Sequence, residues 1–132
     1  MLNYPPKILI AFGETISGNE QIHKWLLSNG FPELAALSNA IRGSEEAWHW
    51  MMKNGFPQYG ALDHAIDGNP NARQWLINNN FAFLVILADA CNKNRDAMNY
   101  LISNDLQIFI MIVKKIVDYR DNQYFDYHKI HF

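Results

Sequence analysis

The residues of this chain best suited to catalysis are one cysteine and a short cluster of acids and a histidine. Cys91 is the only cysteine, and a thiol nucleophile needs a base beside it. His64 follows Asp63 and precedes Asp67, a combination that can transfer protons. Adjacent side chains on a helix, however, do not face each other. We therefore expect these three polar groups to form a solvated patch with no catalytic role.

Two other sets of residues have ligand-binding chemistry. His128 and His131 are spaced like two ligands on one helix face, whereas a structural zinc site needs about four. Trp25, Trp50 and Trp75 carry rings that could stack on bases or sugars. Because each lies on an apolar helical stripe, packing in the core explains them better. The sequence thus predicts no catalytic residue, no cofactor and no metal site.

The elements that hold these residues recur along the chain. A shift of 25 positions aligns the sequence with itself without gaps, as in repeat proteins. One column contains Trp25, Trp50, Trp75 and Tyr100. Two more columns contain Asn29, Asn54, Asn79 and Asn104, and Ile16, Ile41, Ile66, Cys91 and Ile116. Cys91 therefore occupies an isoleucine position, which core packing explains.

Each repeat is predicted to contain two short helices. Leu34, Leu37 and Ile41 form one apolar stripe at helical spacing, and Gly43 ends that helix because glycine adopts the left-handed conformation without steric cost. Ser44 then caps a second helix with a stripe of its own. The same capping column contains Asn19, Asn69 and Asn94. Helices of about ten residues are marginal alone, so the pairs must stack on one another.

We therefore predict an all-α fold, an α-solenoid of about four 25-residue helix-turn-helix repeats with terminal capping helices. The first helices of the units, which we call A helices, are expected at Pro6–Ser17, Pro32–Arg42, Pro57–Asp67, Phe81–Asn92 and Leu106–Tyr119. The second helices, or B helices, are expected at Glu20–Ser28, Glu45–Lys53, Pro70–Asn78 and Arg95–Ser103.

The whole chain, residues 1–132, is predicted to be a single helical-repeat domain. Residues 1–18 are an N-terminal capping half-repeat, residues 19–105 are the tandem repeats, and residues 106–132 are a C-terminal cap. The tail from Asp121 places Phe125 in the tryptophan column but Asp126 in a leucine column. We interpret this tail as a degraded fifth B helix.

The strings AIRGSEEAWHWMMKNGF and AIDGNPNARQWLINNNF resemble the second half of an ankyrin repeat. An alanine-rich first helix ends at a glycine, the second helix carries paired large apolar residues, and Gly55 follows Gly43 at the ankyrin spacing. The Thr-Pro-Leu-His opening is absent, and the unit is too short for the ankyrin β-hairpin. The resemblance, which covers residues ~30–104, implies intracellular protein binding without catalysis.

Composition narrows the class of partner. The net charge is −2 and the lysines and arginines are scattered, whereas binding to nucleic acid needs a basic stripe. No segment approaches the ~20 apolar residues that cross a bilayer. A single cysteine agrees with a reducing compartment. We expect a cytoplasmic protein that binds neither nucleic acid nor membrane.

The outward face of the A helices is nearly free of charge. It combines small residues such as Ala35 and Gly60 with larger apolar ones, and uncharged faces of this kind often mark interfaces. The predicted partner-binding residues are Ala36, Asn39, Ala61, His64, Val85, Ile86, Asp89, Ile110 and Met111. We therefore predict a non-enzymatic protein-protein interaction module that binds a partner helix or peptide on this face.

Alternatives to an open binding face remain. The apolar strings FAFLVILADA and LQIFIMIVKK could simply be buried, under the aromatic tail or against a second copy of the chain. In the last case the protein is a self-associating homodimer that uses the same face. An enzyme would need a polar cavity with convergent titratable groups, which we expect to be absent.

Overall fold

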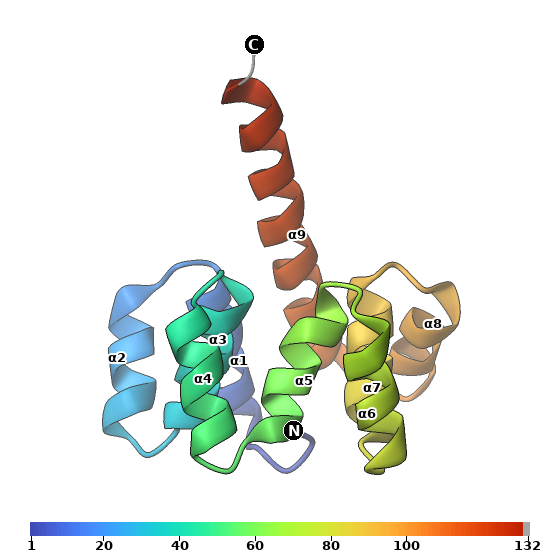
Figure 1. Cartoon of the computed structure of the whole chain (residues 1–132), viewed down its shortest axis with the longest axis horizontal. Helices are drawn as coiled ribbons and strands as arrows, with labels where there is room; N and C mark the ends of the chain where they lie inside the picture. The colour runs from blue at the N-terminus through green and yellow to red at the C-terminus, as the bar shows by residue number, and fades with distance from the viewer. Residues whose placement is uncertain (131–132) are drawn as a thin grey trace.

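The computed structural model describes the backbone of residues 1–130 and the side chains of residues 1–122. Helices are the only regular secondary structure in this part of the chain (Figure 1). The helices are α1 (Pro6–Ile16), α2 (Glu20–Ser28), α3 (Pro32–Ile41), α4 (Glu45–Lys53), α5 (Pro57–Ile66), α6 (Pro70–Asn78), α7 (Ala82–Cys91), α8 (Arg95–Ser103) and α9 (Gln107–Ile130). The predicted all-α class is confirmed. The predicted bounds of α2, α4, α6 and α8 are matched to the residue.

Side-chain caps at both ends explain why these helices begin and end where they do. At the start of α6, Asn69 Oδ1 accepts a hydrogen bond from the Ala72 N–H at 3.0 Å. At its end, Asn79 Nδ2 donates to the Trp75 carbonyl at 2.8 Å. The equivalent N-cap residues of the other outer helices are Asn19, Ser44 and Asn94, and the equivalent C-terminal residues are Asn29, Asn54 and Asn104. Cap residues at 25-residue spacing therefore set equal lengths for the four helices.

A left-handed residue separates the two helices of each unit. Gly43 has φ of 102° between α3 and α4, a conformation that costs glycine little. Lys93 occupies the same place between α7 and α8 and still adopts φ of 66°. The turn is therefore imposed by the packing of the two helices and does not depend on glycine alone.

The odd-numbered helices form a closed inner ring. Each packs against the next, and α9 packs against both α7 and α1. The even-numbered helices lie outside, and each contacts the inner helix before it and the inner helix after it. One layer of the core inside the ring contains Phe12, Leu37, Leu62, Leu87 and Ile112, all at most 4% exposed. Burial of these large side chains holds the short helices together.

The junction of α1 and α9 closes the ring through both packing and polar contacts. A side chain at Gly13 would lie 3.1 Å from Met111 Cε, so the two helices approach closely there. Lys115 Nζ lies 3.4 Å from Glu14 Oε1 and 3.1 Å from Ser17 Oγ. The row of A helices therefore encloses its core and leaves no open concave groove.

The last helix differs from the prediction. A separate fifth B helix from Asp121 was expected, but α9 continues from Gln107 to Ile130 and projects beyond the ring (Figure 1). The reason is the absence of a stop signal, because Asp118 and Tyr119 stand where the other units have the left-handed residue and the N-cap. Tyr119 instead donates its hydroxyl to the Arg42 carbonyl at 3.0 Å. No helix in the described residues has the length and apolar character required to span a membrane.

Candidate binding clefts on the outer side

The predicted partner-binding residues of the A helices are less accessible than expected. Val85 and Ile110 are only 8% and 9% exposed, so the expectation that they point outward is wrong. Inner helices are covered twice, by the core on one side and by the outer helices on the other. Four further predicted residues, Ala36, Ala61, Ile86 and Met111, are half-buried and pack against the core.

The polar residues of the predicted face lie in separate clefts. Asn39, His64 and Asp89 are half-buried, on α3, α5 and α7 respectively. Asp89 receives two hydrogen bonds from Arg73, at 2.8 Å each. The structure therefore does not bring the nine predicted residues together in one groove: Ala36 and Asn39 line one cleft, His64 lines another, and Val85 and Ile110 are buried.

One of these clefts is open and apolar. It has a volume of about 400 Å³ and lies between α2 and α4. Leu27 and Trp50 line it from the two outer helices, and Ala35 and Ala36 of α3 line its floor. Leu27 is 49% exposed, so a large apolar side chain borders this groove. The other lining residues are His23, Pro32, Asn39, Ser44, Glu46 and Ala47.

The side chains at the equivalent places in the later repeats differ from those of this groove. In the second repeat, Met52 lies over Gly60, where an added Cβ would be 2.7 Å from its sulfur. In the third, Val85 and Ile86 replace the two alanines of the floor. In the first groove, small floor residues leave room for a foreign side chain.

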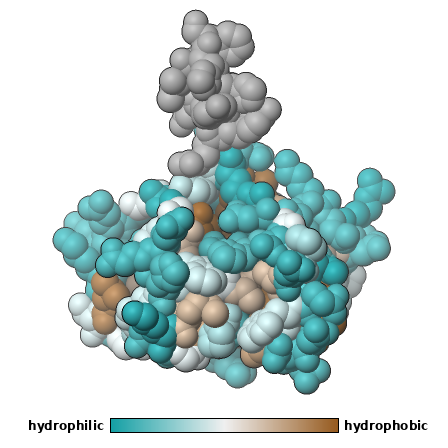
Figure 2. Space-filling model, viewed as in Figure 1, coloured by the Kyte–Doolittle hydropathy of each residue, from teal (hydrophilic) through white to brown (hydrophobic). Residues whose placement is uncertain are grey.

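Of the three tryptophans predicted to lie in the core, Trp50 is half-buried and packs against it, whereas the prediction is wrong for Trp25 and Trp75. Trp25 is 40% exposed and Trp75 is 36% exposed. Trp50 and Trp75 flank the start of the next inner helix, where they stack on Phe56 and Phe81 with centroids 6.0 Å and 5.9 Å apart. A second exposed apolar column contains Leu27, Met52, Ile77 and Ile102. Figure 2 shows that hydrophobic colour on the viewed face is confined to patches among hydrophilic side chains. The 25-residue spacing was the signal in the sequence that could have revealed this second column.

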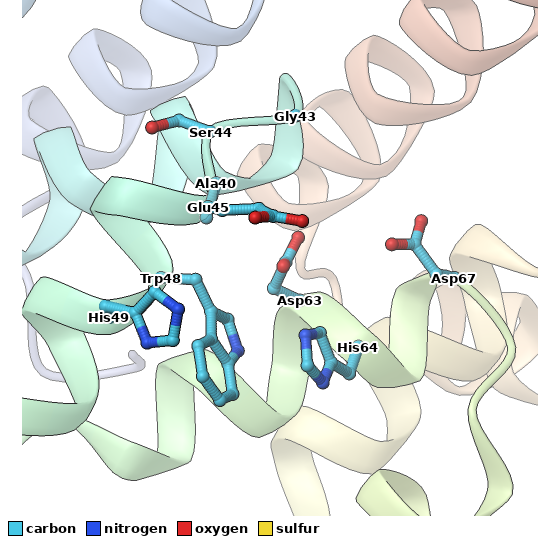
Figure 3. Close-up of a pocket in the computed structure, with 9 residues that line it drawn as sticks. All are labelled: Ala40, Gly43, Ser44, Glu45, Trp48, His49, Asp63, His64 and Asp67. Atoms are coloured by element: carbon cyan, nitrogen blue, oxygen red, sulfur yellow. The ribbon is translucent and has the colours of Figure 1, made fainter.

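The cleft between α4 and α5 contains the polar groups singled out from the sequence. It has a volume of about 360 Å³. Its titratable lining residues are Glu45, His49, Asp63, His64 and Asp67 (Figure 3). The expectation that no polar cavity would gather titratable groups is therefore wrong. Figure 3 shows the Glu45 and Asp63 carboxylates turned toward each other, with Asp67 at the edge of the cleft.

Aromatic rings form the opposite wall of this polar cleft. The Trp48 ring stacks on His64 with centroids 4.6 Å apart and planes 6° apart. Trp48 Nε1 donates to the Gly60 carbonyl at 3.0 Å, which joins α4 to α5 and fixes the indole. His49 contacts the same ring edge-on at 5.1 Å. The wall is thus held in place before any ligand arrives.

Asp63 has the most perturbed carboxyl group of the cleft. Asp63 lines the cleft and is only 6% exposed, so the predicted solvated patch is wrong for this residue. Burial, with a smaller contribution from the charge of Asp67, raises the pKa of Asp63 to about 7. A carboxyl with this pKa can exchange a proton near neutral pH. Ser44 also lines this cleft, but its hydroxyl oxygen already accepts a hydrogen bond from the Ala47 N–H as a helix cap.

The other residues considered for chemistry are accounted for by packing or lie outside the described side chains. Cys91 is buried, and burial raises the pKa of its thiol to about 12, which keeps it protonated. No three His, Cys, Asp or Glu side chains of residues 1–122 lie close enough together to hold a metal ion. His128 and His131 lie outside the described side chains.

Comparison of the chain with protein-family models, with curated proteins and with solved structures gives no match. The clefts must therefore be interpreted from their own geometry.

Proposed function

We propose that this chain is a non-enzymatic protein-protein interaction module of the cytoplasm. Its repeats form an α-solenoid that curves until the first and last inner helices meet, a fold similar to ankyrin repeats without their hairpin. A partner helix or peptide docks on the outer side and inserts a large apolar side chain into the groove between α2 and α4. The proposed docking site is therefore the α2–α4 groove, and not the open A-helix face predicted from the sequence.

The observation that supports this proposal is the combination of an exposed wall and a small-residue floor. Leu27 leaves half of its surface in water, and burying it under a partner gains roughly 1 kcal/mol from its apolar area. Ala35 and Ala36 leave space below it for one inserted side chain. His23, Asn39 and Glu46 at the edges offer polar groups that can select the partner.

A non-enzymatic role fits this groove because its lining lacks the groups that catalysis needs. Of the ten residues around it, only His23 and Glu46 have acidic or basic side chains. His23 Nε2 is 3.2 Å from the Ala35 carbonyl, so its ring is held by the α3 backbone. Binding by shape and apolar contact is what such a surface can do.

The test is a selection of displayed peptides against the full chain, followed by calorimetry with the purified peptides. We expect the selected peptides to carry a large apolar residue. Ala36→Phe, which fills the floor, should weaken their binding by about tenfold or more. The matched control Ile102→Asp removes an equally exposed apolar side chain far from the groove and should leave binding unchanged. Equal affinities for wild type and Ala36→Phe would contradict the proposal.

Self-association is the second candidate, and the exposed column Leu27, Met52, Ile77 and Ile102 favours it. Four outer helices that each present one apolar side chain could pair with those of another copy. Light scattering over a range of concentrations separates the two functions. A stable dimer that Ile77→Asp converts to a monomer would favour the homodimer over a free groove.

A further inference from the structure

The polar cleft of α4 and α5 is one of four equivalent positions around the ring. Each lies between the first half of an outer helix and the second half of the inner helix that follows. The first cleft is lined by Lys24 and Arg42, and the fourth by Lys93, Arg95 and Lys114. In the third, Arg73 forms an ion pair with Asp89. Each of these three positions therefore contains a cation of the chain itself.

The second cleft has the opposite charge pattern. It is lined by the carboxyl groups of Glu45, Asp63 and Asp67, and no lysine or arginine is among its described lining residues. Arg120 is the nearby cation on α9, and it donates to the Ile66 carbonyl at the end of α5. The acids of this cleft thus have no cation among the lining residues, whereas Asp89 in the third position is paired with Arg73.

Asp63 gives independent evidence for a ligand. The residue as a whole is only 6% exposed, its carboxylate is aimed into the cleft, and it receives no hydrogen bond from the described residues (Figure 3). The equivalent residues of the other inner helices are Gly13, Ser38, Ala88 and Val113, which are small, uncharged and buried. Packing at this position therefore does not need a carboxyl group. A buried carboxylate without a partner costs stability, and a bound cation would offset that cost.

The shape of the cleft favours an extended planar cation. The rings of Trp48 and His64 stack face to face beside the carboxylates, so that the ring edges and the outer faces of the stack are left for a ligand. The acids are spread along the cleft and are too far apart for any three to enclose a metal ion. A guanidinium group is planar, can donate five N–H hydrogen bonds, and packs well on aromatic rings.

We propose that this cleft binds an arginine side chain of the partner peptide. Glu45 and Asp63 accept hydrogen bonds from its guanidinium, and Trp48 and His64 contact its apolar stem. The inference rests on the proposed function, because the docked partner supplies the arginine. Its site is separate from the apolar groove, since Trp48 and Trp50 of the same helix line different clefts.

The experiment is an NMR titration of the full ¹⁵N-labelled chain with N-acetyl-arginine methylamide at low salt. The reporter is the Trp48 indole N–H, identified as the signal that Trp48→Phe removes. We expect a saturable shift with a dissociation constant on the order of millimolar, as suits one side chain. The uncharged citrulline analogue should give no shift, and the lysine analogue should bind about fivefold more weakly because it lacks the planar fork.

Matched variants locate the binding. Glu45→Gln and Asp63→Asn should each weaken arginine binding by about tenfold. Glu20→Gln changes the equivalent acid of the first cleft and should have no effect. Glu45 is exposed, so its variant tests the site without risk to the fold.

An absent shift, an equal shift with citrulline, equal affinity for lysine, or an equal effect of Glu20→Gln and Glu45→Gln would each overturn the proposal. The titration needs no partner protein, and its variants leave the α2–α4 groove intact. Failure here is therefore distinguishable from failure of peptide binding in that groove.

Discussion

At Asp63, the repeat carries a carboxyl group where its other copies carry small uncharged residues. The side chain is buried beside Asp67, and its pKa is raised from an ordinary value of 3.8 to about 7. Such a group favours the folded state only while it is protonated. In the absence of a ligand, Asp63 is thus a source of instability at neutral and alkaline pH.

Asp63→Asn should remove this pH dependence. Between pH 4 and pH 7 the folded protein binds one more proton than the unfolded chain at this site, so the free energy of unfolding falls as pH rises through that window. We expect the variant to match wild type near pH 4 and to exceed it by about 4 kcal/mol at pH 8, because the pKa is raised by about three units and each unit corresponds to about 1.4 kcal/mol. Urea unfolding at several pH values measures the difference. A difference that does not change with pH would show that Asp63 does not titrate in this range.

The outer helices owe their uniform length to caps at both ends. A nine-residue helix such as α6 has few internal hydrogen bonds, so a cap that satisfies an unpaired backbone N–H makes a large relative contribution. The N-cap asparagine or serine and the C-terminal asparagine recur in each outer helix. The hydrogen bonds of these caps are local, so they do not depend on which side chains form the core.

Asn69→Ala should therefore destabilise the protein by about 1 kcal/mol, because the Ala72 N–H loses its acceptor. The matched control is Asn71→Ala, which changes an exposed asparagine two residues later in the same helix and should leave stability the same or slightly higher. Thermal unfolding followed by circular dichroism measures both. Equal stability of the two variants would show that the cap is dispensable.

At the scale of the whole molecule, closure of the inner ring decides which surfaces are available. The contact of α1 with α9 places the A helices between the core and the outer helices. Binding surfaces are therefore left on the outer side and in the clefts between neighbouring helices. The close approach at Gly13 depends on the absence of a side chain there.

Gly13→Val should open this junction. Its Cβ would lie 3.1 Å from Met111 Cε and 3.2 Å from Lys115 Cδ, and two further methyl groups would follow. We expect a loss of about 1–3 kcal/mol, as for other overpacked sites, and faster hydrogen exchange in α1 and α9. Ala82→Val, at the exposed start of α7, is the control and should cost less than about 0.5 kcal/mol. If hydrogen exchange in α1 and α9 were the same in Gly13→Val as in wild type, the close approach at Gly13 would not be needed to close the ring.

The secondary structure and its repetition were predictable from the sequence. Glycine, proline and asparagine at 25-residue spacing set the ends of the helices through local backbone chemistry, which needs no distant contact. The columns of leucine and isoleucine likewise identified the inner stripe, as the burial of Leu37 and Leu62 confirms. The prediction of a separate tail helix was wrong because it relied on the column pattern alone. The residues that end a helix and begin the next are absent there, so α9 continues.

The binding surfaces depended on the tertiary structure. Helical periodicity tells which residues share a face, but it does not tell how many neighbours cover that face. Val85 and Ile110 are buried because outer helices pack over them, and Asp63 is in a cleft because α4 lies beside α5. Those arrangements follow from the angle between successive helix pairs, which is set by contacts between residues far apart in the chain.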